Sequence, residues 1–174
     1  MKTLVIIPSR LSATRLPGKP LLEINGLSMI SHVFKRAERA NIGEVIVASG
    51  DQEIIDDVKK NGGNAILTQN QHKTGTDRIF EVLQKIDNSN IDLIMNLQGD
   101  EPTIDIDDIK KLKNLMSEYK SELGTLGSKI SDNKIFKNHN AVKVKTEKDL
   151  DNSNFPKANN FMRKIFSKNK NIYH

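Results

Sequence analysis

Three basic side chains follow the first apolar run of the chain. Arg10, Arg15 and Lys19 lie in the segment 8–20 (PSRLSATRLPGKP), which contains three prolines and Gly18. Proline and glycine at this density exclude a helix, so the cations occupy a restrained loop. No acidic residue precedes position 23. Fixed cations without neighbouring carboxylates suit a polyphosphate ligand, although a solvated basic loop explains these residues equally well.

A carboxylate and an amide form a second candidate group, in the segment 97–102 (LQGDEP). Asp100 can bind Mg²⁺, an ion that proteins usually hold with one or two carboxylates together with substrate phosphates. Gln98 offers an amide that can hydrogen-bond to a ribose or a base. Gly-Asp and Glu-Pro are also common turn dipeptides, so this segment alone supports either a binding site or a polar turn.

The segment 72–78 (HKTGTDR) is the third candidate. Gly75 and Thr76 lie where a helix is predicted to begin, and the free amides of a helix N-terminus favour an anionic or carbonyl ligand. Arg78 either faces this pocket or forms a surface ion pair. The four histidines of the chain show no metal-binding spacing, and no nucleophile motif is present.

The elements that must position these groups alternate along the first 120 residues. Short apolar runs bounded by turn residues are typical of buried strands, and apolar residues at helical spacing predict helices between them. This alternation predicts an α/β fold, a mostly parallel sheet with helices on both faces. Ligands bind such sheets at the carboxyl ends of the strands, where all three candidate groups are expected. The predicted strands are 3–7, 44–48, 64–68 and 92–97, and the predicted helices are 28–40, a helix capped by Asp51 and closed by Gly62-Gly63, 76–86 and a helix capped by Asp105.

Beyond residue 120 the pattern is less regular. Strands are predicted at 123–130 and 141–146, and the alternation of apolar and basic residues in the second favours a half-exposed or edge position. The basic segment 149–174 is rich in Asn and Lys, and we expect it to be loosely structured. Because no linker or repeat divides the chain, we expect a single domain over 1–174.

The composition excludes several classes of protein. The formal net charge is +5, but residues 151–174 contain five basic residues and one acidic residue, which leaves residues 1–150 close to neutral. Without a basic face interleaved with aromatic residues, we expect no nucleic-acid binding. No apolar run reaches the roughly 20 residues of a membrane helix, and the N-terminal run is too short for a signal peptide. Together with the absence of cysteine, these features favour a cytoplasmic protein.

The three candidate segments, taken in order, resemble those of the 3-deoxy-manno-octulosonate cytidylyltransferases, the CMP-Kdo synthetase family of lipopolysaccharide assembly. The pattern R-x-x-x-x-R-L-P-G-K-P followed by Q-G-D-E-P is specific, whereas a related loop alone occurs across the sugar nucleotidyltransferases. The segment 138–144 (NHNAVKV) is also similar to the family's N-x-N-x-V-K-V pattern, and the resemblance extends to about residue 146. It implies a nucleotide-diphospho-sugar transferase fold with a Rossmann-like sheet, in agreement with the alternation above.

The resemblance implies a reaction of CTP with the sugar acid Kdo that gives CMP-Kdo and pyrophosphate and requires Mg²⁺. Arg10 and Lys19 are then expected to hold the triphosphate and to stabilise the departing pyrophosphate, with Arg15 assisting. Asp100 is expected to bind Mg²⁺. Arg10, Lys19 and Asp100 are thus the expected catalytic residues.

For the remaining parts of the site, the resemblance implies that Gln98 and Arg78 help to recognise cytidine. It also implies a homodimer for the full-length protein. Family members continue past the position of His174 with further sugar-binding residues and a second metal-binding Asp, so we expect the nucleotidyltransferase domain to be incomplete at its C-terminus. Phe161-Met162-Arg163 also stands where the family usually has Phe-Ser-Arg.

Two alternatives stay open at this point. The first is a cytidylyltransferase for another acid sugar, of the sialic-acid type, because the discriminating pocket is expected beyond His174. The second is a non-catalytic module that binds CTP without turning it over.

Overall fold

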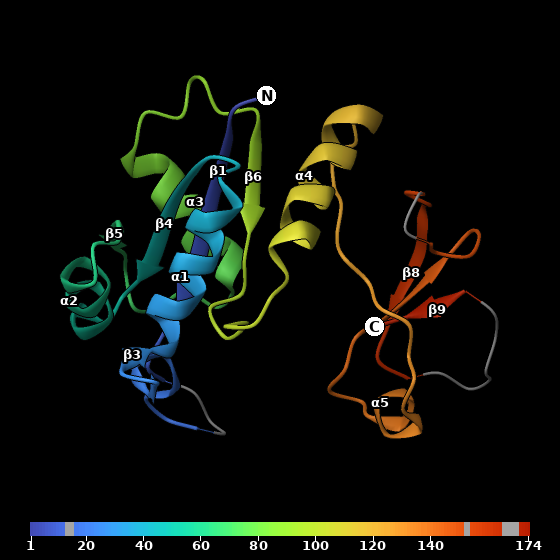
Figure 1. Ribbon diagram of the computed structural model, residues 1–174, viewed down its shortest axis with the longest axis horizontal. Helices are drawn as coiled ribbons and strands as arrows, with labels where there is room; N and C mark the ends of the chain where they lie inside the picture. Colours follow the sequence, from blue (N-terminus) through green and yellow to red (C-terminus); the bar gives the residue numbers. More distant parts are fainter. Residues whose placement is uncertain (13–15, 152–153, 165–170) are drawn as a thin grey trace. The chain divides into compact units, whose positions relative to one another are not determined.

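The chain forms two compact units, Met1–Lys113 and Asn114–His174, and the division between them falls within helix α4 (Figure 1). The expectation of a single domain stays a prediction. None of the helices described is long and apolar enough to cross a membrane. The computed structural model describes residues 1–12, 16–151, 154–164 and 171–174.

The sheet of the first unit is built around β1, which pairs with β4 on one side and with β6 on the other. β5 pairs with β4, so the order is β5-β4-β1-β6 and all pairs are parallel. The carboxyl ends of these strands therefore lie at one edge of the sheet. The first unit contains β1 (Thr3–Ser9), η1 (Lys19–Leu21), β2 (Glu23–Ile24), β3 (Leu27–Ser28), α1 (Met29–Ala40), β4 (Glu44–Ser49), α2 (Gln52–Lys60), β5 (Ala65–Leu67), α3 (Gly75–Lys85), β6 (Leu93–Asn96) and the first part of α4 (Ile106–Tyr119).

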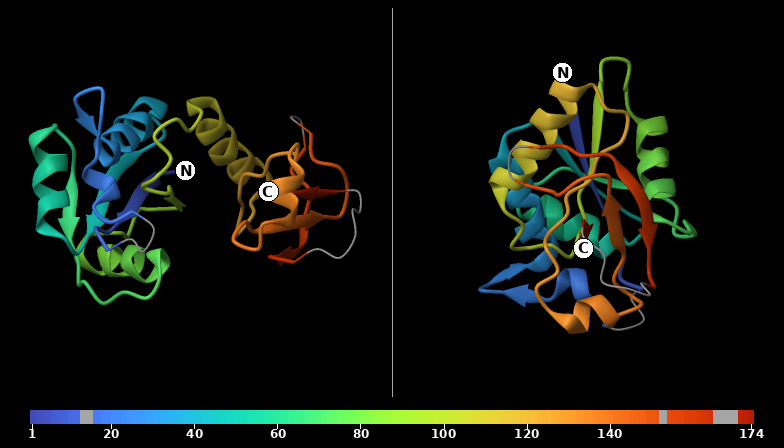
Figure 2. Two further views of the ribbon diagram at one scale, coloured as in Figure 1. Left: turned by 90° about the horizontal axis from the view of Figure 1, so that it is seen from below. Right: turned by 90° about the vertical axis from the view of Figure 1, so that its right-hand side faces the viewer.

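Helices cover both faces of this sheet. β1 sends Val5 and Ile7 into the apolar core formed with α1 and α2, and it sends Leu4 and Ile6 into the core formed with α3. Burial on both faces explains why β1 is a continuous apolar run and not an alternating one. In the left view of Figure 2, α1 and α3 lie on opposite sides of the strands. The predicted α/β class with a parallel sheet is therefore confirmed.

Turn residues end several elements as the sequence predicts. Asn25 and Gly26 have φ values of +50° and +78° and join β2 to β3 as a tight hairpin. Gly62, at φ +82°, follows α2. The hydroxyl of Ser28 accepts a hydrogen bond from Ser31 N at 3.2 Å and caps α1.

A carboxylate on α3 anchors the segment that leads into this helix. Glu81 accepts hydrogen bonds from Gln69 N at 2.9 Å and from His72 Nε2, and it pairs with Lys85 at 2.7 Å. Burial opposes ionisation of Glu81, but the bonds from Lys85, His72 and Gln69 outweigh it and lower the pKa from 4.5 to about 2. The ionised carboxylate therefore holds the chain between β5 and α3 in place.

The second unit contains a three-stranded antiparallel sheet in the order β8-β7-β9. β7 is its central strand and is largely buried, so the half-exposed or edge position expected for 141–146 is wrong. The basic residue Lys143 is fully buried, and its ammonium donates to Asn138 O and, at 3.1 Å, to Arg163 O. Carbonyl groups thus solvate a side chain whose charge suggested exposure. The unit contains the last turns of α4, α5 (Asn133–Lys137), β7 (Lys143–Thr146), β8 (Ala158–Met162) and β9 (Ile172–Tyr173).

Two further expectations for this unit differ from the structure. The segment 123–130 forms no strand among the described residues apart from an isolated bridge between Lys129 and Tyr173. The segment 149–174, expected to be loosely structured, contains β8 and β9. Pairing with β7 makes a strand of β8 (ANNFM), whose Ala and Asn residues have little strand propensity of their own. Tyr173 is 4% exposed, and its hydroxyl accepts from Leu150 N at 2.7 Å, which fixes β9.

The Glu81 anchor predicts a pH dependence of stability. Because its folded pKa lies below the ordinary value, ionised Glu81 stabilises the fold above about pH 4.5, and this contribution is lost as the pH falls toward 2. Replacement by Gln should lower the free energy of unfolding near pH 7 by about 1 to 2 kcal/mol. Thermal unfolding of both proteins between pH 7 and pH 2.5 measures this difference, which should shrink below pH 4.5.

Glu38→Gln, an exposed position on α1, is the matched control and should follow the wild-type curve. A constant difference between E81Q and wild type down to pH 2.5 would contradict the role assigned to the ionised carboxylate.

Candidate nucleotide site

The three candidate segments meet at the carboxyl end of β1. A Cβ atom added to Gly75, at the start of α3, would lie 3.1 Å from Pro8 Cγ. A Cβ atom added to Gly99, in the loop after β6, would lie 3.1 Å from Pro8 O and 3.5 Å from Ser9 Cβ. Both glycines thus bring their segments against the same residue, Pro8. The sheet edge predicted from the sequence is where the structure places all three segments.

The basic loop is held by its own backbone. Gly18 N donates to Leu11 O at 3.1 Å, which closes the loop on itself. Gly18 has φ +70°, a left-handed conformation that glycine adopts without strain, and it precedes the short helix η1. Pro20 is buried inside η1. Lys19 therefore projects from a fixed turn, while Arg10, at the other end of the loop, is exposed.

Lys19 and Asp100 form an ion pair between the basic loop and the loop after β6. Lys19 Nζ donates to Asp100 Oδ2 at 2.9 Å, and the two side chains are 36% and 56% exposed. An ion pair this exposed contributes little to stability. Both charged groups consequently remain accessible to a ligand that approaches the edge of the sheet.

Gln98 is exposed in the same loop, as expected of a residue that contacts a ligand. Its Nε2 donates to Asn96 Oδ1 at 3.3 Å. Arg15 lies outside the described residues.

Arg78 lies deeper than the other predicted site residues. It is 4% exposed, and its Nη1 donates to Thr68 Oγ1 and, at 3.1 Å, to Gln69 O. Burial lowers the pKa of the guanidinium, and Arg10 adds to this effect. The carboxylates of Asp51 and Glu81 oppose it. Arg78 therefore holds the chain after β5 through its buried guanidinium. Its contribution to base recognition stays a prediction.

The sequence pattern predicts Asp51 only as the cap of α2, yet its carboxylate reaches the basic loop. Asp51 Oδ2 accepts a hydrogen bond from Leu11 N at 2.7 Å. The sequence contains one indication of this contact, because Asp51 comes soon after the strand predicted at 44–48, which is the next predicted strand after β1. Only the pairing of β1 with β4, however, brings the two loops together.

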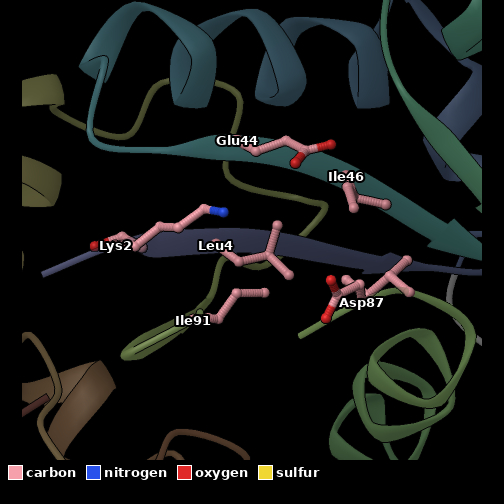
Figure 3. Close-up of a pocket in the computed structure, with 8 residues that line it drawn as sticks. Lys2, Leu4, Glu44, Ile46, Asp87 and Ile91 are labelled. Carbon is pink, nitrogen blue, oxygen red and sulfur yellow. The ribbon is translucent and has the colours of Figure 1, made fainter. Parts of the chain in front are cut away.

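The described residues contain no group of three or more His, Asp or Glu side chains suited to hold a metal by themselves. A cavity of about 110 Å³ lies at the opposite, amino end of the strands (Figure 3). Leu4, Ile46 and Ile91 line it together with the charged residues Lys2, Glu44 and Asp87. None of these is a residue of the candidate site.

Known proteins share this arrangement. The sequence matches the Cytidylyltransferase family over residues 4–173. The 3-deoxy-manno-octulosonate cytidylyltransferase of Rhodopseudomonas palustris (strain BisB18) is 46% identical over 144 residues, which are 82% of this chain and 59% of that protein. The enzyme of the same name from Brucella canis is 43% identical over 145 residues, covering 83% and 58%. The chain therefore spans about three fifths of the length of these relatives.

Solved structures agree with the sequence matches. The structure of CMP:2-keto-3-deoxy-manno-octonic acid synthetase complexed with CTP superimposes with a TM-score of 0.84 and 37% identity, over 99% of this chain and 70% of that one. A cytidylyltransferase from Leptospira borgpetersenii serovar Hardjo-bovis (strain JB197) gives a TM-score of 0.60 and 25% identity, over 76% and 56%. With a family match across nearly its whole length and a Rossmann-like parallel sheet, the chain belongs to the cytidylyltransferase family.

Proposed function

We propose that this chain binds CTP at the carboxyl edge of its parallel sheet and transfers the cytidylyl group to the sugar acid Kdo. The observation that carries the proposal is the meeting of Lys19 and Asp100 at 2.9 Å, with Arg10 on the same loop. A cationic loop facing a carboxylate is what a metal-bound triphosphate requires. The similarity to a synthetase complexed with CTP supports the nucleotide, and the names of the curated relatives support the sugar.

In the proposed reaction, the anomeric hydroxyl of Kdo attacks the α-phosphorus of CTP in line and releases its proton to solvent. The bond from the α-phosphorus to the oxygen that bridges to the β-phosphate breaks, and pyrophosphate leaves. Catalysis of such transfers consists mostly of positioning and charge neutralisation. Arg10 and Lys19 would neutralise the charge that develops on the departing pyrophosphate. Arg15 would assist from the same loop.

Mg²⁺ fits the chemistry of the carboxylate in this site. Asp100 offers one carboxylate, and its side chain is 56% exposed. Mg²⁺ is commonly bound by one or two carboxylates together with substrate phosphates. Asp100 would hold the ion, which would supply further positive charge to the phosphates. Lys19 now occupies the position next to this carboxylate, so its ammonium is expected to turn toward the nucleotide when the ion binds.

Other features of the proposal come from the family resemblance. We expect Gln98 to contact the ribose or base, because its side chain is exposed and it lies two residues before Asp100. Arg78 would act on cytidine from the buried position described above. A homodimer located in the cytoplasm is also expected.

Replacing Lys19 by Ala tests the proposed triphosphate site. Loss of one preorganised cation should weaken CTP binding, measured by calorimetry with Mg²⁺ present, by at least about tenfold. Lys60→Ala, an exposed cation on α2, is the matched control and should bind like wild type. Equal dissociation constants for K19A and wild type would mean that Lys19 is an ordinary surface charge.

Replacing Asp100 by Asn tests the proposed metal ligand. The variant should lose the strengthening of CTP binding by Mg²⁺ and should bind CTP without metal at least as tightly as wild type, because Lys19 is released from its ion pair. Titrations of CTP with and without Mg²⁺ give both quantities. Glu101→Gln removes the neighbouring exposed carboxylate and should keep the metal effect. A full Mg²⁺ effect in D100N would place the metal elsewhere.

A comparison of sugar acids tests the proposed reaction. In a chain extended to the length of the curated relatives, release of pyrophosphate from CTP should be at least about tenfold faster with Kdo than with a sialic acid, because the polar groups of a site built for one sugar acid are left unpaired by the other. Faster release with the sialic acid would overturn the assignment of Kdo. Tight binding of CTP without release for either sugar would overturn the transfer activity of this chain and leave a nucleotide-binding module.

A further inference from the structure

Asp51 occupies the N-cap position of α2 but does not use its side chain as a cap. Its backbone carbonyl accepts from Ile54 N at 3.2 Å, as an N-cap residue should. Within the described chain, however, its carboxylate makes no capping bond to α2. Oδ2 instead accepts from Leu11 N at 2.7 Å, forty residues earlier in the sequence. The side chain at this N-cap position thus binds the basic loop and not its own helix.

The turn that carries Asp51 is rigid. Asp51 N donates to the hydroxyl of Ser49 at 3.1 Å, and Ser49 is fully buried at the end of β4. A Cβ atom added to Gly50 would lie 1.9 Å from Asn70 Oδ1, so the chain after β5 packs directly on this turn. Ser49 also accepts, through its carbonyl, a hydrogen bond from Thr68 N at 2.8 Å. The carboxylate is therefore presented to the basic loop from a fixed support.

Leu11 transmits this support to the cations. Its N–H donates to Asp51, and its carbonyl accepts from Gly18 N at 3.1 Å, so both backbone polar groups of this residue are used. Gly18 precedes Lys19, and Arg10 precedes Leu11. The Leu11 side chain packs against the core shared by β1, α1 and α2. One hydrogen bond accepted by Asp51 thereby supports both ends of the loop that carries Arg10 and Lys19.

The negative charge of Asp51 argues against a purely structural role for its side chain. A carboxylate beside a triphosphate site repels the ligand, and a capping side chain could have been neutral. A short bond to a backbone N–H is strengthened by the negative charge of the acceptor. The carboxylate also lies close enough to Arg78 to stabilise its charged form. The cost of the negative charge is therefore offset by a stronger hold on the loop.

We propose that Asp51 is a positioning residue for the triphosphate site, which acts through the Leu11 peptide to hold Arg10 and Lys19 in their binding geometry. This inference rests on the proposed function, since it assigns a supporting role within the same site. Asp51 itself does not contact the nucleotide.

The test compares three variants in the same CTP calorimetry with Mg²⁺. D51A should weaken CTP binding by about tenfold, the value of one charge-assisted hydrogen bond, and should expose the Leu11 amide to hydrogen exchange in NMR spectra. D51N should bind CTP within about twofold of wild type, because the amide oxygen of Asn can still accept from Leu11 N. Asp56→Asn, which removes an exposed charge from the same helix, should match wild type in both measurements.

The outcomes separate this inference from the proposed function. A wild-type chain that binds no CTP overturns the proposed function itself. A wild-type chain that binds CTP, with D51A binding equally well, overturns the role of Asp51 alone. Tighter binding by both D51A and D51N also overturns it, since the carboxylate would then act only by repulsion. If D51A does not fold, the D51N variant provides the test. A D51N protein whose Leu11 amide is protected but whose CTP binding is weakened tenfold would contradict a role of Asp51 through this hydrogen bond.

Discussion

The close approach of two glycines to Pro8 is the constraint on which the candidate site depends. Gly75 and Gly99 each come within 3.1 Å, measured from an added Cβ, of atoms of Pro8. A larger side chain at either position would push α3 or the loop after β6 away from the end of β1. The candidate residues lie on loops, but the spacing of these segments is set by contacts with Pro8 at the end of the central strand.

Polar groups at this edge of the sheet also hold the basic loop in place. Gly18 closes the loop on Leu11, Asp51 holds Leu11 from β4, and Asp100 meets Lys19 from β6. The loop is thus supported from the strands on both sides of β1. Such support before binding lowers the cost of ordering the cations around a phosphate chain. The exposed pair between Lys19 and Asp100 leaves the two charges that the proposed chemistry needs within reach of solvent.

The two halves of the chain differed in how well their structure could be predicted. In the first unit, short apolar runs and helical spacing correctly indicated β1, β4, β5 and β6 and the helices between them. The pattern is strongest in β1 and β4, which are buried on both faces of the sheet. In the second unit, β8 has the sequence ANNFM, which carries no such pattern. Its strand conformation arises from pairing with β7, and local sequence does not encode a partner.

The amino-acid sequence indicated which residues are candidates to bind a phosphate ligand, namely Arg10, Lys19 and Asp100, and that they follow strands of a parallel sheet. How these residues are held became visible in the tertiary structure. It buried Arg78 beneath the chain after β5 and turned the Asp51 carboxylate from its own helix to the backbone of Leu11. It also buried Lys143, whose charge suggested solvent. In each case a backbone group outside the residue's own helix or strand is among the partners, and backbone groups leave no signature in the sequence.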